Sequence, residues 1–226
     1  MENLIVISLG GSLIVPEEID IDFLKDFRDL ILSQVKKGKK FVIITGGGKI
    51  CRKYQNVALE LSTPSHEDLD WIGIASLRLN AELLRVIFGE YAYEKVIDNL
   101  SQDFSFDKPI VIGSAYEPGQ STDWDSVLGA KTLGAKKIIN LSNTDYVYDS
   151  DPKVNPNAKK IEQISWTEYR KLIPKDWNPG LNSPFDPIAS EMAEKEGITV
   201  FIMNGKPIDN LANCLDGKKF NGTVIS

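Results

Sequence analysis

The sequence predicts an α/β protein, built as a three-layer α/β/α sandwich around a mainly parallel central sheet. Short apolar runs alternate along the chain with longer segments of helical periodicity. The apolar runs show no polar alternation, which is typical of parallel strands that helices cover on both faces. The chain has 226 residues, 42% of them hydrophobic, which is enough for one sizeable core. We therefore expect a single domain over residues 1–226.

Each predicted strand is a short apolar run, and the runs are residues 4–9, 41–45, 109–112, 137–141 and 199–203. The predicted helices are the segments with helical periodicity, near residues 20–37, 48–62, 67–88, 123–134, 165–173 and 185–196. Gly197 follows the last of these helices, where glycine is a favoured C-cap residue. Connections of this length suit right-handed βαβ units. Residues 142–182 contain several Asp-Pro and Asn-Pro pairs and predict turns and short hairpins.

The composition excludes several classes of function. A net charge of −6 gives no basic field to gather nucleic acid or an anionic membrane surface. The chain enters the apolar run 4–9 almost at once, and this run is too short for a signal sequence or a membrane span. The cysteines, Cys51 and Cys214, lack the CxxC spacing of a zinc or redox site, so we expect reduced thiols and a cytoplasmic protein. The single histidine, His66, argues against catalytic triads and histidine metal sites, and we expect no metal ligands from the protein.

Glycine-rich turns follow the first two predicted strands. Residues 9–12 read LGGS, and residues 45–49 read TGGGK directly before a predicted helix. Glycine lets a ligand approach the backbone closely, and the free N–H groups at a helix start favour phosphate. The alternative is that these glycines only make tight turns, although Lys49 and Arg52 just inside the second helix favour the phosphate interpretation. Neither turn has the Walker A or GxGxxG pattern, which disfavours the classical P-loop and dinucleotide folds.

Five segments of the sequence resemble motifs of one family. Residues 46–54, GGGKICRKY, resemble the GGGKxxRxY segment of the archaeal-type UMP kinases, a branch of the amino-acid kinase superfamily. Residues 70–81 resemble their DxIGIxxxRxNA segment, and residues 118–123 resemble PGHTTD. Residues 142–152 resemble TNVDGVYTADP, and residues 221–225 resemble NGTxI. The motifs span nearly the whole chain in the family's order, so the chain is identified as a member of this family.

This resemblance implies the amino-acid kinase fold, with an acceptor (UMP) lobe over residues 1–115 and an ATP lobe over residues 116–226 that share one sheet. It implies the reaction of ATP with UMP to give ADP and UDP, a step of pyrimidine nucleotide biosynthesis, with Mg²⁺ accompanying ATP. Such phosphoryl transfer needs alignment and neutralisation of negative charge rather than covalent chemistry. The family forms homohexamers, as trimers of dimers. The apolar face of the predicted helix 67–88 suits such a contact, or equally the core.

The resemblance places catalytic roles on Arg52, Lys49 and Asp123. Arg52 is the better candidate for a phosphate clamp, because a guanidinium offers a planar set of donors. The alternative for Arg52 is a solvated helix residue. The alternative for Asp123 is an ordinary first-turn acid that the helix dipole favours.

ATP contacts are also implied by the resemblance. They fall on Gly11, Ser12, Gly48, Arg52, Ser142, Asn143, Tyr148 and Asp151. Tyr148 would offer an aromatic face to adenine, and Asp151 would begin the turn that grips the ribose. The alternative for Asn143 and Asp151 is simple turn chemistry.

UMP contacts are implied in the same way. They fall on Gly47, Asp70, Tyr116, Glu117, Pro118, Gly119, Gln120, Ser121 and Thr122. In the family an acid at the position of Asp70 accepts hydrogen bonds from the ribose hydroxyls, whereas without the family Asp70 reads as a surface or helix-N-terminal acid. Thr122 is expected to donate to phosphate, to cap the next helix, or both. Arg78 and Asn80 of the same motif as Asp70 have packing or subunit contact as an alternative role.

The chain departs from the family pattern at three places. Residues 6–9, VISL, lack the lysine that many amino-acid kinases carry before the first glycine turn, so charge neutralisation shifts to Arg52, Lys49 and Mg²⁺. The acceptor loop, residues 113–123, is one residue longer and has Gln and Ser in place of His and Thr. Tyr146 replaces a glycine. These departures leave two alternatives open: another small phosphate or carboxylate as acceptor, or a nucleotide-binding storage or regulatory protein with the same fold.

Overall fold

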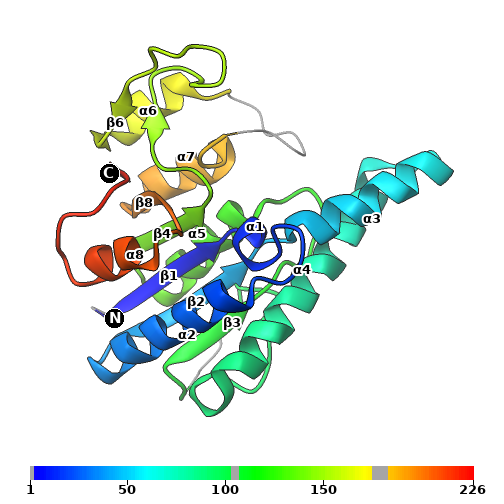
Figure 1. The fold of residues 1–226 in the computed structure, drawn as a ribbon, viewed down its shortest axis with the longest axis horizontal. Coiled ribbons are helices and arrows are strands. Elements are labelled where there is room, and N and C mark those ends of the chain that lie inside the picture. The colour runs from blue at the N-terminus through cyan, green and yellow to red at the C-terminus, as the bar shows by residue number, and fades with distance from the viewer. Residues whose placement is uncertain (1–2, 103–106, 175–182) are drawn as a thin grey trace.

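A seven-stranded sheet forms the centre of the computed structural model, which describes residues 3–102, 107–174 and 183–226 (Figure 1). The strand order is β3-β2-β1-β4-β8-β9-β7, and every pairing is parallel except that of β8 with β9. The strands are β1 (Leu4–Leu9), β2 (Lys40–Thr45), β3 (Ile110–Gly113), β4 (Lys137–Ser142), β7 (Gln163–Ile164), β8 (Thr199–Asn204) and β9 (Thr223–Ile225). The five predicted strands are all present, with ends shifted by at most one residue.

Helices cover both faces of this sheet. They are α1 (Gly11–Ile14), α2 (Ile21–Lys36), α3 (Gly48–Leu61), α4 (His66–Phe88), α5 (Thr122–Leu133), α6 (Trp166–Leu172), α7 (Pro187–Lys195) and α8 (Ile208–Leu215), with a 3₁₀ turn at Gly89–Tyr91. The six predicted helices are confirmed, whereas α1 and α8 were not predicted. The predicted hairpin region contains the antiparallel pair β5 (Val147–Tyr148) and β6 (Lys160–Ile161).

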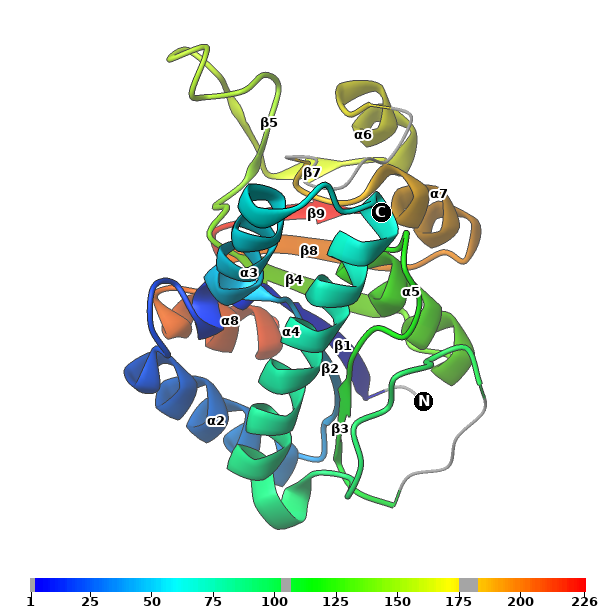
Figure 2. The same ribbon diagram turned by 90° about the vertical axis from the view of Figure 1, so that its right-hand side faces the viewer.

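The side chains of β1 show how the three layers arise. Ile5, Ile7 and Leu9 belong to the hydrophobic cluster beneath α2, α4 and α8, whereas Leu4 and Val6 belong to the cluster beneath α5, α6 and α7. Successive strand residues point to opposite faces, so an unbroken apolar run supplies both cores. Figure 2 shows α2 and α8 on one side of the sheet and α5 and α7 on the other. The predicted α/β/α sandwich is confirmed.

Local sequence determines where several helices begin. Ser65 and Asp68 form a capping box at the start of α4, each side chain bonding the other residue's backbone N–H. For α5 the prediction that Thr122 is the cap was wrong. The helix begins at Thr122, and Ser121, which has an extended backbone, caps it by accepting from the Trp124 N–H at 3.2 Å.

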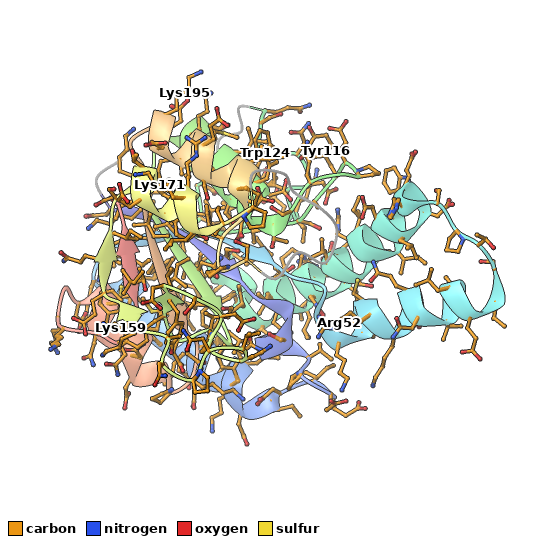
Figure 3. All side chains as sticks on the ribbon, turned by 90° about the horizontal axis from the view of Figure 1, so that it is seen from above. Arg52, Tyr116, Trp124, Lys159, Lys171 and Lys195 are labelled. Atoms are coloured by element: carbon orange, nitrogen blue, oxygen red, sulfur yellow. The ribbon has the colours of Figure 1, made fainter. Side chains whose placement is uncertain are left out.

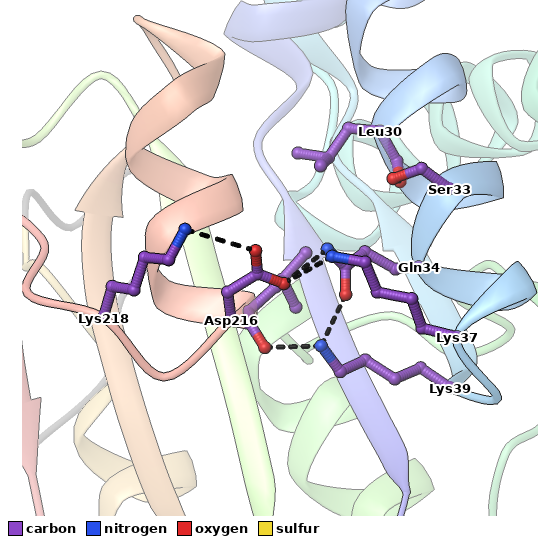
Figure 4. Close-up of polar contacts among 8 residues, drawn as sticks. Leu30, Ser33, Gln34, Lys37, Lys39, Asp216 and Lys218 are labelled. Atoms are coloured by element: carbon purple, nitrogen blue, oxygen red, sulfur yellow. Dashed lines mark hydrogen bonds and ion pairs between the residues drawn. The ribbon is translucent and has the colours of Figure 1, made fainter.

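A polar cluster at the end of the sheet opposite the glycine turns ties α2 to α8 (Figure 4). The buried Gln34 donates to Asp216 Oδ1 at 2.9 Å, and Lys39 Nζ donates to Gln34 Oε1 and to Leu215 O, both at 2.5 Å. Bonds from Lys37 and Gln34 lower the pKa of Asp216 to about 2. The cluster therefore satisfies carbonyl and carboxylate oxygens where two helices end.

No helix among the described residues is both long and apolar enough to cross a lipid bilayer. The residues on either side of position 115 share one sheet, because β1 pairs with β4 along Val6 to Leu9. The carboxyl ends of β1, β2, β4 and β8 therefore lie along one edge, where the glycine turns are also found.

Candidate active site

The two glycine turns touch each other. Leu9 and Thr45 are register partners in β1 and β2, so both turns start at the same level of the sheet. Gly46 N–H donates to Leu9 O at 2.8 Å, and a Cβ added to Gly46 would lie 2.5 Å from the Gly11 nitrogen. A Cβ on Gly11 would overlap the backbone of Gly46 and Gly48. Only glycine permits this approach, and it forms one continuous backbone surface from two strand ends.

The start of α3 is part of this surface. Gly47 occupies the N-cap position and has no side chain with which to cap the helix. Gly48 has a φ of +67°, a conformation that glycine adopts readily. Asn80 on α4 is buried and donates from Nδ2 to Gly46 O at 2.8 Å, which fixes the second turn against α4. Helix N-termini of this kind favour anions through their N–H groups and dipole.

Three cations, Lys49, Arg52 and Lys53, stand in the first two turns of α3. Lys53 Nζ donates to Glu17 O at 3.2 Å. Arg52 is exposed and makes no hydrogen bond or ion pair with the described part of the chain. Figure 3 shows it near the end of α3 that joins the body of the molecule. Lys49 instead pairs with the carboxylate of Glu17, and its backbone N–H donates to Val15 O at 3.1 Å. The arginine is therefore available for a ligand, whereas both lysines already have a partner.

Asp123 lies in the first turn of α5, as its alternative role requires, but its carboxyl group also accepts hydrogen bonds from other elements. Its Oδ1 accepts from Ser8 Oγ at 3.3 Å and from Asn140 Nδ2 at 2.8 Å, and its Oδ2 accepts from the Asp186 N–H at 3.0 Å. Protein atoms crowd the carboxyl group, although part of the side chain still meets solvent. Burial raises the pKa of Asp123 to about 7 against the opposing effect of these hydrogen bonds.

Sequence reasoning missed the residues that hold Asp123. Ser8 and Asn140 are register partners in β1 and β4, so one carboxylate oxygen bridges the two central strands. The Asp186 side chain caps α7 by accepting from the Ala189 N–H at 2.7 Å. A signal was present, because Ser8 and Asn140 are polar residues inside otherwise apolar strands.

Asp70 lies beside the predicted acceptor loop. Its Oδ2 accepts from the Gly119 N–H at 2.8 Å, although 49 residues separate the two. Asp70 is in the second turn of α4, so it is not a helix-N-terminal acid. Arg78, from the same motif, pairs with Asp98 and Glu82, which fits its alternative packing role.

The acceptor loop and the start of α5 contain polar atoms that the protein itself leaves unpaired. Among the described residues, the buried side-chain atoms without a hydrogen-bond partner are Ser114 Oγ, Gln120 Oε1, Trp124 Nε1 and Asp125 Oδ2. Burial, and then the neighbouring Glu117, raise the pKa of Tyr116. Gly119, Gln120, Ser121 and Trp124 line a pocket of about 200 Å³ together with Asp186 and Ile188. Buried polar groups in native proteins rarely stay unpaired, so we expect a ligand or an ordered water to bind these atoms.

A larger pocket of about 470 Å³ lies beyond β4, lined mainly by residues 143–153. It brings together Asn143, Tyr148 and Asp151, three of the predicted ATP residues. Asp151 also makes a turn, because its Oδ1 accepts from the Lys153 N–H at 2.9 Å. Ser142 lies outside this lining and accepts from the Thr144 N–H at 3.1 Å.

Tyr146, which replaces a glycine of the family pattern, adds its bulk to the wall of this pocket. It is buried, its hydroxyl donates to Asn221 Oδ1 at 3.2 Å, and its ring meets that of Tyr148 edge-on at 6.4 Å. Lys160 Nζ lies 4.6 Å from the Tyr146 ring centroid. Tyr146 therefore packs against Tyr148, the aromatic side chain predicted to face adenine.

An α/β sandwich with touching glycine turns at the strand ends, an arginine beside them that no described residue binds, and a pocket beyond the next strand is the arrangement expected of a phosphotransferase. The family model described as "Amino acid kinase family" matches residues 3–204, and the chain belongs to this family.

Curated relatives match the chain over its whole length. The uridylate kinase of Thermococcus kodakarensis is 34% identical, over 98% of this chain and 98% of its own. The uridylate kinase of Methanobrevibacter smithii is 33% identical, over 98% and 99%. The crystal structure of uridylate kinase from Archaeoglobus fulgidus has a TM-score of 0.82 and 31% identity, with both chains fully covered. The UMP kinase of Bacillus anthracis, at 22% identity and a TM-score of 0.80, shows the shared fold.

Proposed function

We propose that this chain transfers the γ-phosphoryl group of ATP to UMP, giving ADP and UDP. The observation that carries the proposal is the contact of the two glycine turns next to Arg52. The hydrogen bond from Gly119 of the acceptor loop to Asp70 adds to it. Full-length similarity to curated uridylate kinases supports UMP as the acceptor. The reaction is a step of pyrimidine nucleotide synthesis.

The chemistry requires little covalent participation by the protein. An oxygen of the UMP phosphate attacks the γ-phosphorus of ATP, a new P–O bond forms, and the bond from that phosphorus to the β–γ bridging oxygen breaks. ADP leaves with the bonding electron pair. The UMP phosphate is already anionic, so no general base is needed. The protein aligns the two phosphates and offsets their repulsion.

Backbone groups and cations together align the phosphates and offset their repulsion. Gly11 and Ser12 are proposed to face the ATP phosphates and Gly47 the UMP phosphate, with Gly48 between them. Arg52, which is free of partners in the described structure, clamps the group in transfer. Mg²⁺ enters with ATP as part of the substrate and neutralises phosphate charge.

The remaining predicted residues orient the two nucleotides. Asp70 keeps Oδ1 for a ribose hydroxyl of UMP while Oδ2 holds the loop at Gly119. The loop residues from Tyr116 to Thr122 enclose the rest of UMP. The pocket beyond β4 receives adenosine, with Tyr148 against the base. This division makes residues 1–115 the main acceptor lobe and residues 116–226 the ATP lobe.

Assembly and location form part of the proposal. Tyr54, Val57 and Leu61 form an apolar row on α3, and all three are exposed, Leu61 by 80%. Such a row at helical spacing suits a contact with a second copy of the chain, as in a homohexamer built from dimers. Two free thiols support a cytoplasmic location.

An acceptor screen tests the proposed reaction. ADP release is measured with UMP, CMP, dUMP, isopentenyl phosphate and N-acetylglutamate as acceptors. We expect UMP to give the highest kcat/KM. If another acceptor is turned over as fast as UMP or faster, that compound becomes the proposed substrate in place of UMP. ATP binding without any product would favour a storage or regulatory role.

Arg52→Ala tests the clamp. Loss of a charge-assisted bond made mainly in the transition state predicts a drop in kcat of roughly 10²-fold with little change in either KM. Arg28→Ala is the matched control, because Arg28 is a surface arginine on α2 that pairs only with the adjacent Asp29 among the described residues. Unchanged kcat in Arg52→Ala, with a native fold by circular dichroism, contradicts the assigned role.

A further inference from the structure

The segment between α1 and α2, residues 15–20, runs past the start of α3 and is held there by three contacts. We name this segment the strap. Val15 O accepts from the Lys49 N–H at 3.1 Å, and Glu17 O accepts from Lys53 Nζ at 3.2 Å. The third contact is the ion pair between the Glu17 carboxylate and Lys49 Nζ. Because two of the contacts use main-chain oxygens, the strap stays attached to α3 when Glu17 loses its charge.

The other end of the strap is held by the second half of the chain. Asp20 caps α2 by accepting from the Phe23 N–H at 3.0 Å, and it pairs with Lys206 Nζ at 2.5 Å. Bonds from Lys206 and Phe23 lower the pKa of Asp20. Lys206 directly follows Gly205, whose N–H donates to Ser142 O at 3.0 Å. The strap is thus fixed at both ends, and its first residue, Val15, lies against both glycine turns, since its N–H donates to Gly11 O at 2.8 Å and its oxygen would lie 3.2 Å from a Cβ on Gly48.

Lys49 differs from Arg52 in what it already binds. Both cations stand in the first turns of α3, beside the touching backbones of Gly11 and Gly48. Arg52 has no partner among the described residues, whereas the ammonium group of Lys49 is paired with Glu17. The Lys49 backbone is fixed by Val15 O, but its four-carbon side chain can turn about several bonds. The ammonium group can therefore change partners while the glycine turn stays in place.

We propose that Glu17 holds Lys49 as a substitute for phosphate, and that the γ-phosphate of ATP displaces the Glu17 carboxylate from Lys49 when ATP binds. This inference rests on the proposed function, because it takes Lys49 to meet the phosphoryl group in transfer. Glu17 is a positioning residue, since it acts only through Lys49. No bond is made or broken in this exchange apart from the ion pair.

Exposure makes the exchange feasible. The side chains of Lys49 and Glu17 are 38% and 67% exposed, so water screens their attraction. A terminal phosphate carries more charge and more acceptor oxygens than one carboxylate. Glu17 therefore loses the competition when ATP is present, and it neutralises Lys49 when ATP is absent. This competition lowers the affinity of the site for ATP by a small amount.

Glu17→Gln measures that loss. Titration calorimetry of the full chain at low salt compares a non-hydrolysable ATP analogue with ADP. We expect the analogue to bind about 1.5- to 5-fold more tightly to the variant, the range that an exposed ion pair allows. ADP affinity stays unchanged, because ADP lacks the γ-phosphate. The gain shrinks as salt is added.

Glu18→Gln is the matched control. Glu18 is the next residue of the strap, and its side chain makes no hydrogen bond or ion pair with any described residue. The control removes the same charge from the same segment, and we expect neither affinity to change. Equal tightening of the analogue and ADP in Glu17→Gln overturns the proposal in favour of a general charge effect. Weaker analogue binding overturns it as well, because Glu17 would then hold Lys49 in its binding position.

A double variant separates this inference from the proposed function. Glu17→Gln should tighten analogue binding in the unmodified chain but not in Lys49→Met. The variants Glu17→Gln/Lys49→Met and Lys49→Met should therefore bind the analogue equally, and tighter binding by the double variant overturns the exchange. Analogue binding by Lys49→Met that equals that of the unmodified chain shows that Lys49 does not meet the γ-phosphate, and also overturns it. If the exchange is observed but no acceptor is phosphorylated, the proposed function fails and the exchange stands.

Discussion

Two carboxyl groups near the start of α5 lie among protein atoms and form no ion pair with any described residue. Asp125 is only 1% exposed, and its Oδ2 has no hydrogen-bond partner among the described residues. Burial alone raises the pKa of Asp125 to about 7. Asp123, with three hydrogen-bond donors, reaches about the same value because burial outweighs them. Both groups are thus easier to protonate in the folded chain than in the unfolded chain.

The raised pKa values of Asp123 and Asp125 determine how pH changes the stability of the chain. An aspartate with a raised pKa binds its proton more tightly when folded, so the stabilisation is complete below the unfolded value of 3.8. The stabilisation is lost as the pH rises towards 7, where the folded form must carry a buried charge. We therefore expect the free energy of unfolding to fall between pH 4 and pH 7 on account of these residues.

Asp125→Asn should remove the Asp125 part of this dependence. The neutral amide has the same shape, so the variant should gain stability relative to the unmodified chain, by roughly 2–3 kcal/mol more at pH 8 than at pH 5. Urea unfolding at the two pH values measures the difference. Asp26→Asn, at an exposed position of α2, serves as control and should show no such change. An equal effect at both pH values would mean that Asp125 is ionised throughout this range.

At the scale of elements, the glycine turns depend on backbone contact between β1–α1 and β2–α3. The two strands are parallel neighbours, and their last residues are paired. A side chain on Gly11 has no room, because the backbone of the other turn occupies its place. The turns can move apart only if α1 and α3 shift on the sheet.

Gly11→Ala should therefore lower both turnover and stability. Overlap in a close-packed region predicts a loss of about 1–3 kcal/mol in the free energy of unfolding. Gly73→Ala is the control for stability, since Gly73 lies inside α4 and a Cβ there would make only ordinary contacts, at 3.8 Å, with Cys51 and Gln55 of α3. That control should stabilise the chain by roughly 0.5–1 kcal/mol through helix propensity. Equal unfolding midpoints in the two variants would contradict the close contact of the turns.

Some elements could be predicted from sequence and some could not. The strands β1, β2, β4 and β8 are apolar runs of six residues or nearly so, which gives a clear signal. The helix α1 has four residues and β9 has three, too few to show a period. Pairing with β8 holds β9 in place, and Thr223 Oγ1 accepts from the Val147 N–H at 2.8 Å. Tertiary contact therefore decides these short elements.

At the scale of the whole molecule, the α3–α4 pair reaches beyond the sheet (Figures 1 and 3). Gly48 is the only residue of α3 that is buried in the described part of the chain. The exposed row of Tyr54, Val57 and Leu61 has no covering element among the described residues. Under the proposed homo-oligomer, a second copy covers this row.

Val57→Glu should disrupt that assembly. A charge in the middle of the apolar row would have to be buried at the contact, so we expect the variant to elute as a smaller species. Size-exclusion chromatography with light scattering measures the mass. Asn56→Glu adds the same charge at an exposed polar position one residue away and should keep the assembly intact. Equal masses for both variants would place the interface elsewhere.

The sequence by itself determined the layered fold, the two glycine turns and the family, because apolar runs and ordered motifs are local features of the chain. It also named Arg52, Asp70 and the acceptor loop, whose ligands stay predictions. Only the tertiary structure decided that the turns touch, that Asp123 bonds Ser8 and Asn140, and that Glu17 pairs with Lys49. These contacts join residues far apart in the chain, and their geometry depends on how the sheet brings the strand ends together.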